Sequence, residues 1–68
     1  MVTVATLVRW YKAEGDAVQA GDVICELETD KASVEIQAWE SGTLHQLKKV
    51  GDTVSVSESP ARIDPPDQ

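Results

Sequence analysis

The chain is short and acidic. Its 68 residues carry 12 Asp and Glu against 6 Lys and Arg, which gives a net charge of −6. A chain of this length forms one small domain with a marginal core, which favours a carrier or binding module over a free-standing enzyme. The charge disfavours nucleic acid and anionic membranes as partners, because phosphates bind clustered Lys and Arg. An acidic surface suits docking on a basic protein surface, and it equally suits solubility alone.

Cysteine usage and hydropathy indicate the kind of compartment in which the chain is expected. Cys25 is a single cysteine, so no internal disulfide forms, which fits a reducing compartment. No run is long and apolar enough to span a membrane, and residues 1–5 have neither a basic region nor a signal-type segment. We therefore do not expect secretion of the chain as given.

Taken in order, the segments predict strands and turns. No segment has a sustained helical period, so the predicted fold is all-β. Turns or loops are expected at residues 13–16, 21–22, 39–42 and 48–52. Four glycines fall in them and are expected to adopt backbone angles that other residues resist: Gly15, Gly21, Gly42 and Gly51. Strands are expected at residues 2–11, 17–20, 23–27, 34–38, 43–47, 53–56 and 60–63.

The chain repeats itself at an offset of 36 residues. Gly15-Asp16-Ala17-Val18 matches Gly51-Asp52-Thr53-Val54 without a gap. Two copies are too few for a solenoid, so we expect a sandwich or flattened barrel of two antiparallel sheets with two-fold pseudo-symmetry. The same offset relates Val8 to Leu44, Tyr11 to Leu47, Lys12 to Lys48, Leu27 to Ile63 and, more weakly, Gly21-Asp22 to Ser57-Glu58.

The repeat makes predictions about both ends of the chain. The counterpart of the strand at residues 34–36 would fall before Met1, so the first strand is expected to be missing or shortened. Pro60 cannot donate to a strand ladder, so the last strand is predicted to begin there or to lie at an edge. The terminal sheet is then looser than the other, and Lys31 lies at the end of the molecule opposite both termini.

The most informative stretch is Glu28-Thr29-Asp30-Lys31-Ala32-Ser33, between two strand-like runs. Its polar residues predict a β-hairpin with Lys31 at or beside the tip. A lysine there offers a primary amine on a long stem, open to a modifying enzyme. A solubilising charge is the simpler interpretation of an exposed lysine.

This stretch, with its surroundings, resembles the lipoylation motif of the lipoyl domains of 2-oxo acid dehydrogenase complexes. The resemblance covers residues 8–63 and includes the glycine turns as well as Glu28, Thr29, Asp30, Lys31 and Ala32. Biotin carrier domains share the fold and a hairpin lysine, but they usually place methionine on both sides of it. Asp30 and Ala32 occupy those positions here, which favours lipoyl over biotinyl. A biotin carboxyl carrier and an unmodified lipoyl-like interaction module are the alternatives.

The resemblance implies a carrier without a catalytic site of its own. Lipoate would form an amide with Lys31, and Glu28 and Glu35 are candidates for steering partners. The implied partners are a lipoate ligase or octanoyl transferase, a 2-oxo acid decarboxylase, an acyltransferase and dihydrolipoyl dehydrogenase. Its arm would carry acyl groups and reducing equivalents between their active sites.

The resemblance also implies boundaries and a location. Residues 1–63 would form a single lipoyl-carrier domain, and residues 64–68 a tail or the start of a linker. Met1 and the short first strand favour a free-standing carrier, whereas Pro65-Pro66 equally suits an interdomain linker. The expected location is the bacterial cytoplasm, or the mitochondrial matrix for a domain excised from a eukaryotic acyltransferase.

Other candidate residues are weaker. His45 is interpreted as a strand-surface histidine with no Ser, Cys or Asp placed for catalysis. Cys25 is expected to be a small buried hydrophobe, and Trp10 and Trp39 structural aromatics. One His and one Cys supply too few ligands for a metal site.

Overall fold

The computed structural model describes residues 4–55 and 58–66 of the chain. No residue in these ranges is helical, and the all-β prediction is confirmed. Seven strands form there: β1 (Val4–Trp10), β2 (Ala17–Val18), β3 (Val23–Glu28), β4 (Ser33–Gln37), β5 (Gly42–Gln46), β6 (Thr53–Ser55) and β7 (Ala61–Asp64).

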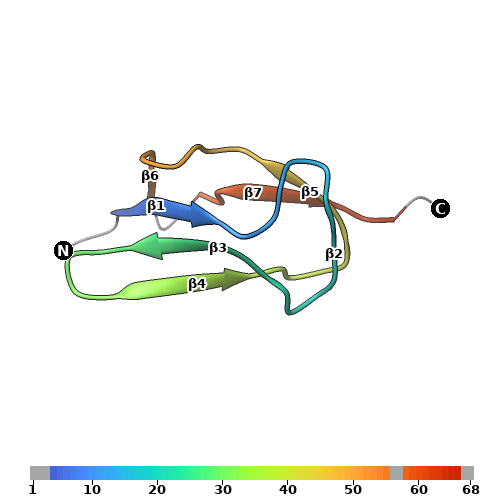
Figure 1. Cartoon of the computed structure of the whole chain (residues 1–68), viewed down its shortest axis with the longest axis horizontal. Coiled ribbons are helices and arrows are strands. Elements are labelled where there is room, and N and C mark those ends of the chain that lie inside the picture. The colour runs from blue at the N-terminus through green and yellow to red at the C-terminus, as the bar shows by residue number, and fades with distance from the viewer. Residues whose placement is uncertain (1–3, 56–57, 67–68) are drawn as a thin grey trace.

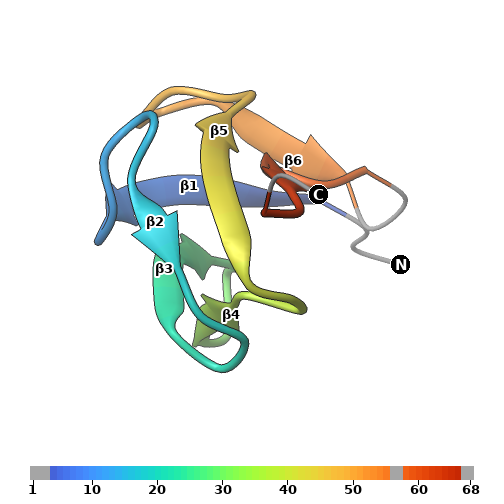
Figure 2. The same cartoon turned by 90° about the vertical axis from the view of Figure 1, so that its right-hand side faces the viewer.

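The strands form two antiparallel sheets. One has four strands in the order β4-β3-β1-β6, and the other has three in the order β2-β5-β7. Figure 1 shows the molecule elongated along its strands, and Figure 2, seen along that axis, shows β5 of the three-stranded sheet crossing in front of β1 of the four-stranded sheet. The arrangement is the predicted flattened sandwich rather than a closed barrel.

The core lies between the two sheets. Directly paired residues of neighbouring strands share a face, so Leu7 and Leu27 form one inward row, and Val34 at the edge of the same face is 47% exposed. Leu44 and Ile63 form the corresponding row of the other sheet. Full burial of one such side chain contributes roughly 1.5–3 kcal/mol. The buried hydrophobic residues of the described ranges are Leu7, Val18, Ile24, Cys25, Ala38, Leu44, Val54, Ala61 and Ile63.

The predicted pseudo-symmetry is present in the strand pairing. Strand β1 pairs with β3 and β6, and β5 pairs in the same way with β7 and β2. The glycine turns match as well. Asp16 Oδ2 accepts the N–H of Ala13 at 2.7 Å, and Asp52 Oδ2 accepts the N–H of Lys49 at 2.9 Å. Aspartate therefore closes the same turn in both halves.

The two halves also hold each other reciprocally. Trp10 Nε1–H donates to the carbonyl of Lys48 at 3.2 Å, and Gln46 Nε2–H donates to the carbonyl of Lys12 at 3.0 Å. Each bond joins the last residue of a central strand, β1 or β5, to the turn of the other half. Trp10 therefore has a structural role, as predicted.

One detail of the predicted repeat is wrong. The sequence offset matches Val8 with Leu44, but the structure matches Leu7 with Leu44. Both leucines are fully buried, and each donates its N–H at 2.9 Å to the carbonyl of the turn aspartate of the other half. The cause is an irregularity in β1 between Leu7 and Arg9, which inserts Val8 as an extra residue and leaves it 36% exposed.

Strand β4 has no counterpart in the described part of the chain. It covers the outer edge of β3, whereas no strand of residues 4–55 or 58–66 covers the equivalent edge of β7. The ends of the chain follow from this asymmetry. Thr6 pairs with Glu28, so β1 begins at the same end of the molecule as the Lys31 turn, while β7 ends at the other (Figure 1).

The prediction that Lys31 lies opposite both termini is therefore right for the C-terminal strand and wrong for the start of β1. A counterpart of β4 would return the chain to the far end, and the described residues contain none. Met1, Val2 and Thr3 lie outside the described residues. The expectation of a looser terminal sheet stays a prediction.

The last strand follows the prediction from proline. Pro60 is buried, β7 begins at the next residue, and β7 is the outer strand of its sheet. Strand β7 includes Asp64, and the proposed division between a domain at 1–63 and a tail at 64–68 stays a prediction.

The close approach of β5 to β7 makes Gly42 sensitive to substitution. A Cβ at Gly42 would overlap the carbonyl oxygen of Asp64 and lie 3.0 Å from Ile63 Cγ2. We expect Gly42→Ala to lower the free energy of unfolding by about 1–3 kcal/mol, because neither neighbour can yield without breaking the β5–β7 pairing. Chemical denaturation measures this loss.

Gly15 provides the control. Its φ is +86°, and no atom lies within 4 Å of the position that a Cβ would take. Asparagine tolerates positive φ, so Gly15→Asn should cost about 1 kcal/mol or less, whereas Gly42→Asn should cost at least as much as Gly42→Ala. A Gly42→Ala variant as stable as the parent would contradict the close approach.

Candidate functional site

The predicted hairpin is present, and Lys31 lies at its tip. Strand β3 ends at Glu28 and β4 begins at Ser33, which face each other as the last strand pair. The N–H of Thr29 donates to the carbonyl of Ala32 at 2.8 Å. Asp30 and Lys31 are thus the two residues that reverse the chain.

The side chain of Thr29 holds this turn together. Its Oγ1 accepts the N–H of Lys31 at 3.2 Å and the N–H of Ala32 at 3.1 Å, and its hydroxyl donates to the carbonyl of Ala32 at 3.2 Å. No non-glycine residue of the described ranges has positive φ, so the turn does not use the left-handed backbone of the commonest two-residue hairpins. The sequence predicted Thr29 only as a member of the motif around Lys31, without a role of its own in the turn. A threonine two residues before the lysine is the available signal, since its hydroxyl bonds nearby amides.

The lysine amine is open to a partner. Asp30, Lys31 and Ala32 are all exposed, and Lys31 Nζ forms no ion pair with any described residue. The ammonium stem therefore extends freely from a turn whose backbone is fixed. This combination suits enzymatic acylation, which needs a reachable amine at a defined position.

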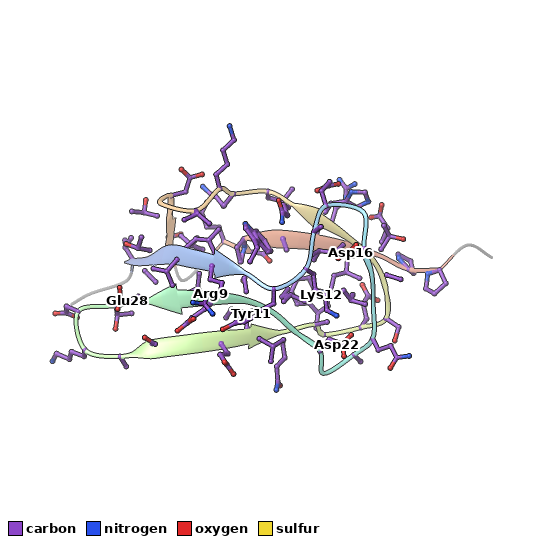
Figure 3. The ribbon with its side chains drawn as sticks, viewed as in Figure 1. Arg9, Tyr11, Lys12, Asp16, Asp22 and Glu28 are labelled. Atoms are coloured by element: carbon purple, nitrogen blue, oxygen red, sulfur yellow. The ribbon has the colours of Figure 1, made fainter. Side chains whose placement is uncertain are left out.

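Carboxylates surround the base of the hairpin. Glu28 and Glu35 are exposed, and Glu35 lies directly opposite Glu26. Arg9 faces Glu26 from β1, and the Tyr11 hydroxyl donates to Glu26 Oε1 at 3.3 Å, which offsets the like-charge pair. Figure 3 shows Glu28 beside the turn, with Arg9 and Tyr11 farther along the same sheet. The outer face near Lys31 is therefore acidic.

The turn glycines lie outside the Lys31 turn. Gly15, Gly21 and Gly51 have φ of +86°, +95° and +97° in connections between strands, and Gly42 begins β5. They position strands and do not contribute side chains to the site.

The thiol of Cys25 is sequestered in the core. Cys25 is 0% exposed, and burial raises its pKa to about 11. The expectation of a buried hydrophobe is confirmed. The thiol stays protonated near neutral pH, so it is a poor partner in thiol–disulfide exchange.

His45 lies in β5 with a partly exposed side chain, as expected of a strand-surface histidine, and two carboxylates contact its ring. Its Nδ1 lies 2.7 Å from Glu14 Oε2 and its Nε2 lies 3.1 Å from Asp64 Oδ2. The pKa of Glu14 lies below its usual value, mainly because its carboxylate accepts the N–H of Gln46 and then because it contacts His45. Carboxylates hold both ring nitrogens, so His45 joins β5 to the β1–β2 turn and to β7. Sequence spacing could not reveal this cluster, because its members come from separate elements.

Other features of the described residues add no second site. Residues 4–55 and 58–66 contain no group of three potential metal ligands and no helix long and apolar enough to cross a membrane. Trp39 is 52% exposed in the β4–β5 connection.

Comparison with known proteins identifies the family of this chain. A family model described as "Biotin-requiring enzyme" matches residues 1–63. The chain belongs to the biotinyl/lipoyl-carrier family. Over 58 residues it is 48% identical to the dihydrolipoyllysine-residue succinyltransferase component of the 2-oxoglutarate dehydrogenase complex of Bacillus subtilis. It is 39% identical over 64 residues to a mitochondrial dihydrolipoyllysine-residue acetyltransferase component of the pyruvate dehydrogenase complex of Arabidopsis thaliana.

The alignments cover most of this chain and little of those relatives. They span 84% and 82% of the chain but only 14% and 12% of the two acyltransferase components. Among solved structures, the chain resembles the lipoyl domain of the 2-oxoglutarate dehydrogenase complex of Azotobacter vinelandii. The TM-score is 0.78 at 30% identity, with 97% of this chain and 85% of that chain covered. The predicted resemblance to lipoyl domains is confirmed.

The hydroxyl of Thr29 can be tested directly. Thr29→Val keeps the shape of the side chain but removes one donor and one acceptor that serve three bonds. We expect the free energy of unfolding to fall by about 1 kcal/mol and the amides of Asp30 and Lys31 to become more mobile. Denaturation and ¹⁵N relaxation measure the two effects.

Thr29→Ser retains the hydroxyl and is the matched control. It should keep the turn rigid despite the loss of a methyl group. Equal mobility of the tip in the Val and Ser variants would show that the hydroxyl does not hold the turn.

Proposed function

We propose that this chain is a lipoyl carrier domain with its lipoyl group attached to Lys31. The observation that carries the proposal is the exposed lysine at the tip of a hairpin whose backbone Thr29 fixes, with no ion pair to any described residue. Identity to dihydrolipoyllysine acyltransferase components over 84% of the chain supports it. Asp30 and Ala32 shape the turn on either side.

The residues present fit this group. An amide between Lys31 Nζ and the carboxyl of lipoate needs only a reachable amine and space around it, and the hairpin tip provides both. The amide removes the lysine charge, so the modified domain is one unit more negative than the −6 of the bare chain. When bound, the lipoyl dithiolane supplies acyl transfer and redox chemistry.

The chain itself contributes the position of the lipoyl arm. The hairpin places the arm at one end of an elongated molecule, away from β7 (Figure 1). Tethering to a mobile domain raises the effective concentration of a carried group at each active site to about the mM range for a short flexible link. The burial of Cys25 keeps the protein's own thiol away from the arm. No catalytic residue of the chain is required.

The acidic surface at the base of the hairpin is the proposed recognition surface. Glu28 and Glu35 flank the tip, and their charge suits enzymes with basic entrances. These enzymes would be a lipoate ligase or octanoyl transferase, a 2-oxo acid decarboxylase, an acyltransferase and dihydrolipoyl dehydrogenase. The arm would shuttle acyl groups and reducing equivalents among them, in the bacterial cytoplasm or the mitochondrial matrix.

A biotin carrier is the second candidate, because the matching family model is described by biotin-requiring enzymes. Both carriers use a hairpin lysine, so the fold does not discriminate between them. The residues on either side of Lys31 carry the distinction. Aspartate and alanine replace the methionines that biotin carriers usually have.

Replacing the lysine tests the attachment site. Lys31→Arg keeps the charge and the hairpin but removes the nucleophilic amine, so lipoylation should be abolished. Intact mass and peptide mapping after expression in a lipoylating host measure this result. Lys49→Arg, in an exposed turn, is the control and should be modified like the parent.

Lipoyl recovered on Lys12, Lys48 or Lys49 of the Lys31→Arg variant would contradict the assignment. A parent chain that carries no added mass after coexpression with a lipoate ligase would favour an unmodified interaction module.

The neighbours of Lys31 test the choice of cofactor. Changing Asp30 and Ala32 together to methionine should shift the domain from lipoylation toward biotinylation, because it restores the flanks that biotin carriers present. Side-by-side rates with purified lipoate ligase and biotin ligase provide the measurement. If the unchanged domain is the better substrate of the biotin ligase, the lipoyl assignment is wrong.

A further inference from the structure

The hydroxyl of Thr29 closes the Lys31 turn in place of a main-chain group. The N–H of Thr29 donates to the carbonyl of Ala32 at 2.8 Å, but the N–H of Ala32 donates to Thr29 Oγ1 at 3.1 Å rather than to the carbonyl of Thr29. A two-residue hairpin loop usually has main-chain bonds in both directions across this pair. One side of the turn is therefore held by a side chain.

The same oxygen also fixes the residue that carries the amine. Thr29 Oγ1 accepts the N–H of Lys31 at 3.2 Å, and the Thr29 hydroxyl donates to the carbonyl of Ala32 at 3.2 Å. In the part of the chain that the structure describes, no other side chain bonds the main chain of residues 29–32. The direction in which the Lys31 side chain leaves the turn thus depends on one hydroxyl group.

The backbone of the tip does not hold this shape by itself. The two-residue loops that match the twist of a hairpin need positive φ, which no non-glycine residue of the described ranges adopts. Asp30 and Lys31 are both exposed, so core packing does not restrain them. Without the hydroxyl, we expect these two residues to sample several turn conformations while the Glu28–Ser33 pair stays closed.

An enzyme that modifies Lys31 meets few side chains at the tip. Asp30 and Ala32 offer one carboxylate and one methyl group beside the amine, and the lysine stem itself is flexible. The shape of the main chain is therefore a large part of what distinguishes this amine from the other lysine amines of the chain. A main chain that is already held in one conformation does not have to be ordered on binding, which lowers the cost of recognition.

We propose that Thr29 is a positioning residue for lipoylation. Its hydroxyl holds the main chain of Lys31 in the conformation that the modifying enzyme binds. This role rests on the proposed function, because it requires Lys31 to be the attachment site. Thr29 has no bond to the amine, and it acts only through the main chain of Lys31 and Ala32.

The acylation step itself does not use Thr29. In a ligase that activates lipoate with ATP, the uncharged amine of Lys31 attacks the carbonyl carbon of the mixed anhydride of lipoate and AMP. The C–N bond forms, the bond from that carbon to the AMP oxygen breaks, AMP leaves with the bonding electrons, and the nitrogen releases one proton to solvent. Loss of the Thr29 hydroxyl should therefore weaken binding of the tip and leave the rate of this step unchanged.

Steady-state kinetics of the whole chain with purified lipoate ligase, lipoate and ATP test the proposal. In Thr29→Val the turn that the ligase binds becomes a minor conformer, and the apparent affinity falls with the fraction of competent molecules. We expect KM for the domain to rise about tenfold, which corresponds to a competent fraction of about one tenth, while kcat stays within about twofold. Thr29→Ser retains the hydroxyl and should have the KM of the parent.

Two controls separate position from stability and from reactivity. Thr43→Val makes the same chemical change in β5 of the other sheet, where the side chain has no hydrogen bond to a described residue, so its KM should equal that of the parent. The N-hydroxysuccinimide ester of acetic acid should acylate Lys31 equally fast in the parent and in Thr29→Val, because this small reagent does not bind the turn. Amide spectra check that each variant is folded at the assay temperature, and Thr29→Ala replaces Thr29→Val if valine disturbs the hairpin.

Several results would overturn the proposal. A Thr29→Val variant with the KM and kcat of the parent shows that the ligase does not need the hydroxyl. Equal impairment of Thr29→Ser or of Thr43→Val shows that the loss does not come from this hydroxyl. A fall in kcat at unchanged KM, or slower reaction with the small reagent, assigns the effect to the reactivity of the amine. A parent that the ligase leaves unmodified overturns the proposed function together with this role, whereas the other results overturn the role of Thr29 alone.

Discussion

The structure depends on the reciprocal contact between its two halves at the central strands. Leu7 of β1 and Leu44 of β5 are both fully buried, and each bonds the turn of the opposite half through its main-chain N–H. Neither half can bury its leucine without the other. A chain of 68 residues has little apolar surface to spare, so this exchange makes a stable core possible at such a length.

Because this reciprocal core lies between the two sheets, the tip of the β3–β4 hairpin is not needed for its packing. The inward residues of β3 join the core, and the tip extends beyond it with three polar residues and one small one: Thr29, Asp30, Lys31 and Ala32. The bonds of Thr29 fix the tip locally, so its shape does not depend on the core packing next to it. A carrier benefits from this division, since the modifying enzyme meets a defined turn while the lysine stem keeps its freedom.

The asymmetry between the halves gives the molecule two different ends. At one end, β3 is covered by β4 and presents Lys31 among carboxylates. Away from that turn, β7 has no covering strand in the described residues, and its Arg62 and Asp64 form an ion pair with each other. Within the described residues, the two sheets therefore differ by one strand, β4.

Local patterns along the sequence were enough to determine much of this protein. The lack of a helical period and the turn residues predicted the strands, the repeat of Gly-Asp predicted two related halves, and the polar stretch around Lys31 predicted the hairpin. Pro60 predicted the start of β7, because a missing N–H has the same consequence in any context. Apart from the repeat, these signals lie within a few residues of the structure that they determine.

The remaining features were decided by contacts between distant residues. The extra residue at Val8 is visible only in the register of β1 against β3, because a bulge changes pairing without changing composition. The carboxylates on His45 come from Glu14 and Asp64, which meet only after both sheets have formed. The start of β1 lies beside the Lys31 turn because strand pairing, not chain order, decides which ends meet. The sequence by itself determined the elements and the lysine, and the tertiary structure decided their register, the ion pairs and the open edge, since these depend on distances that no local pattern encodes.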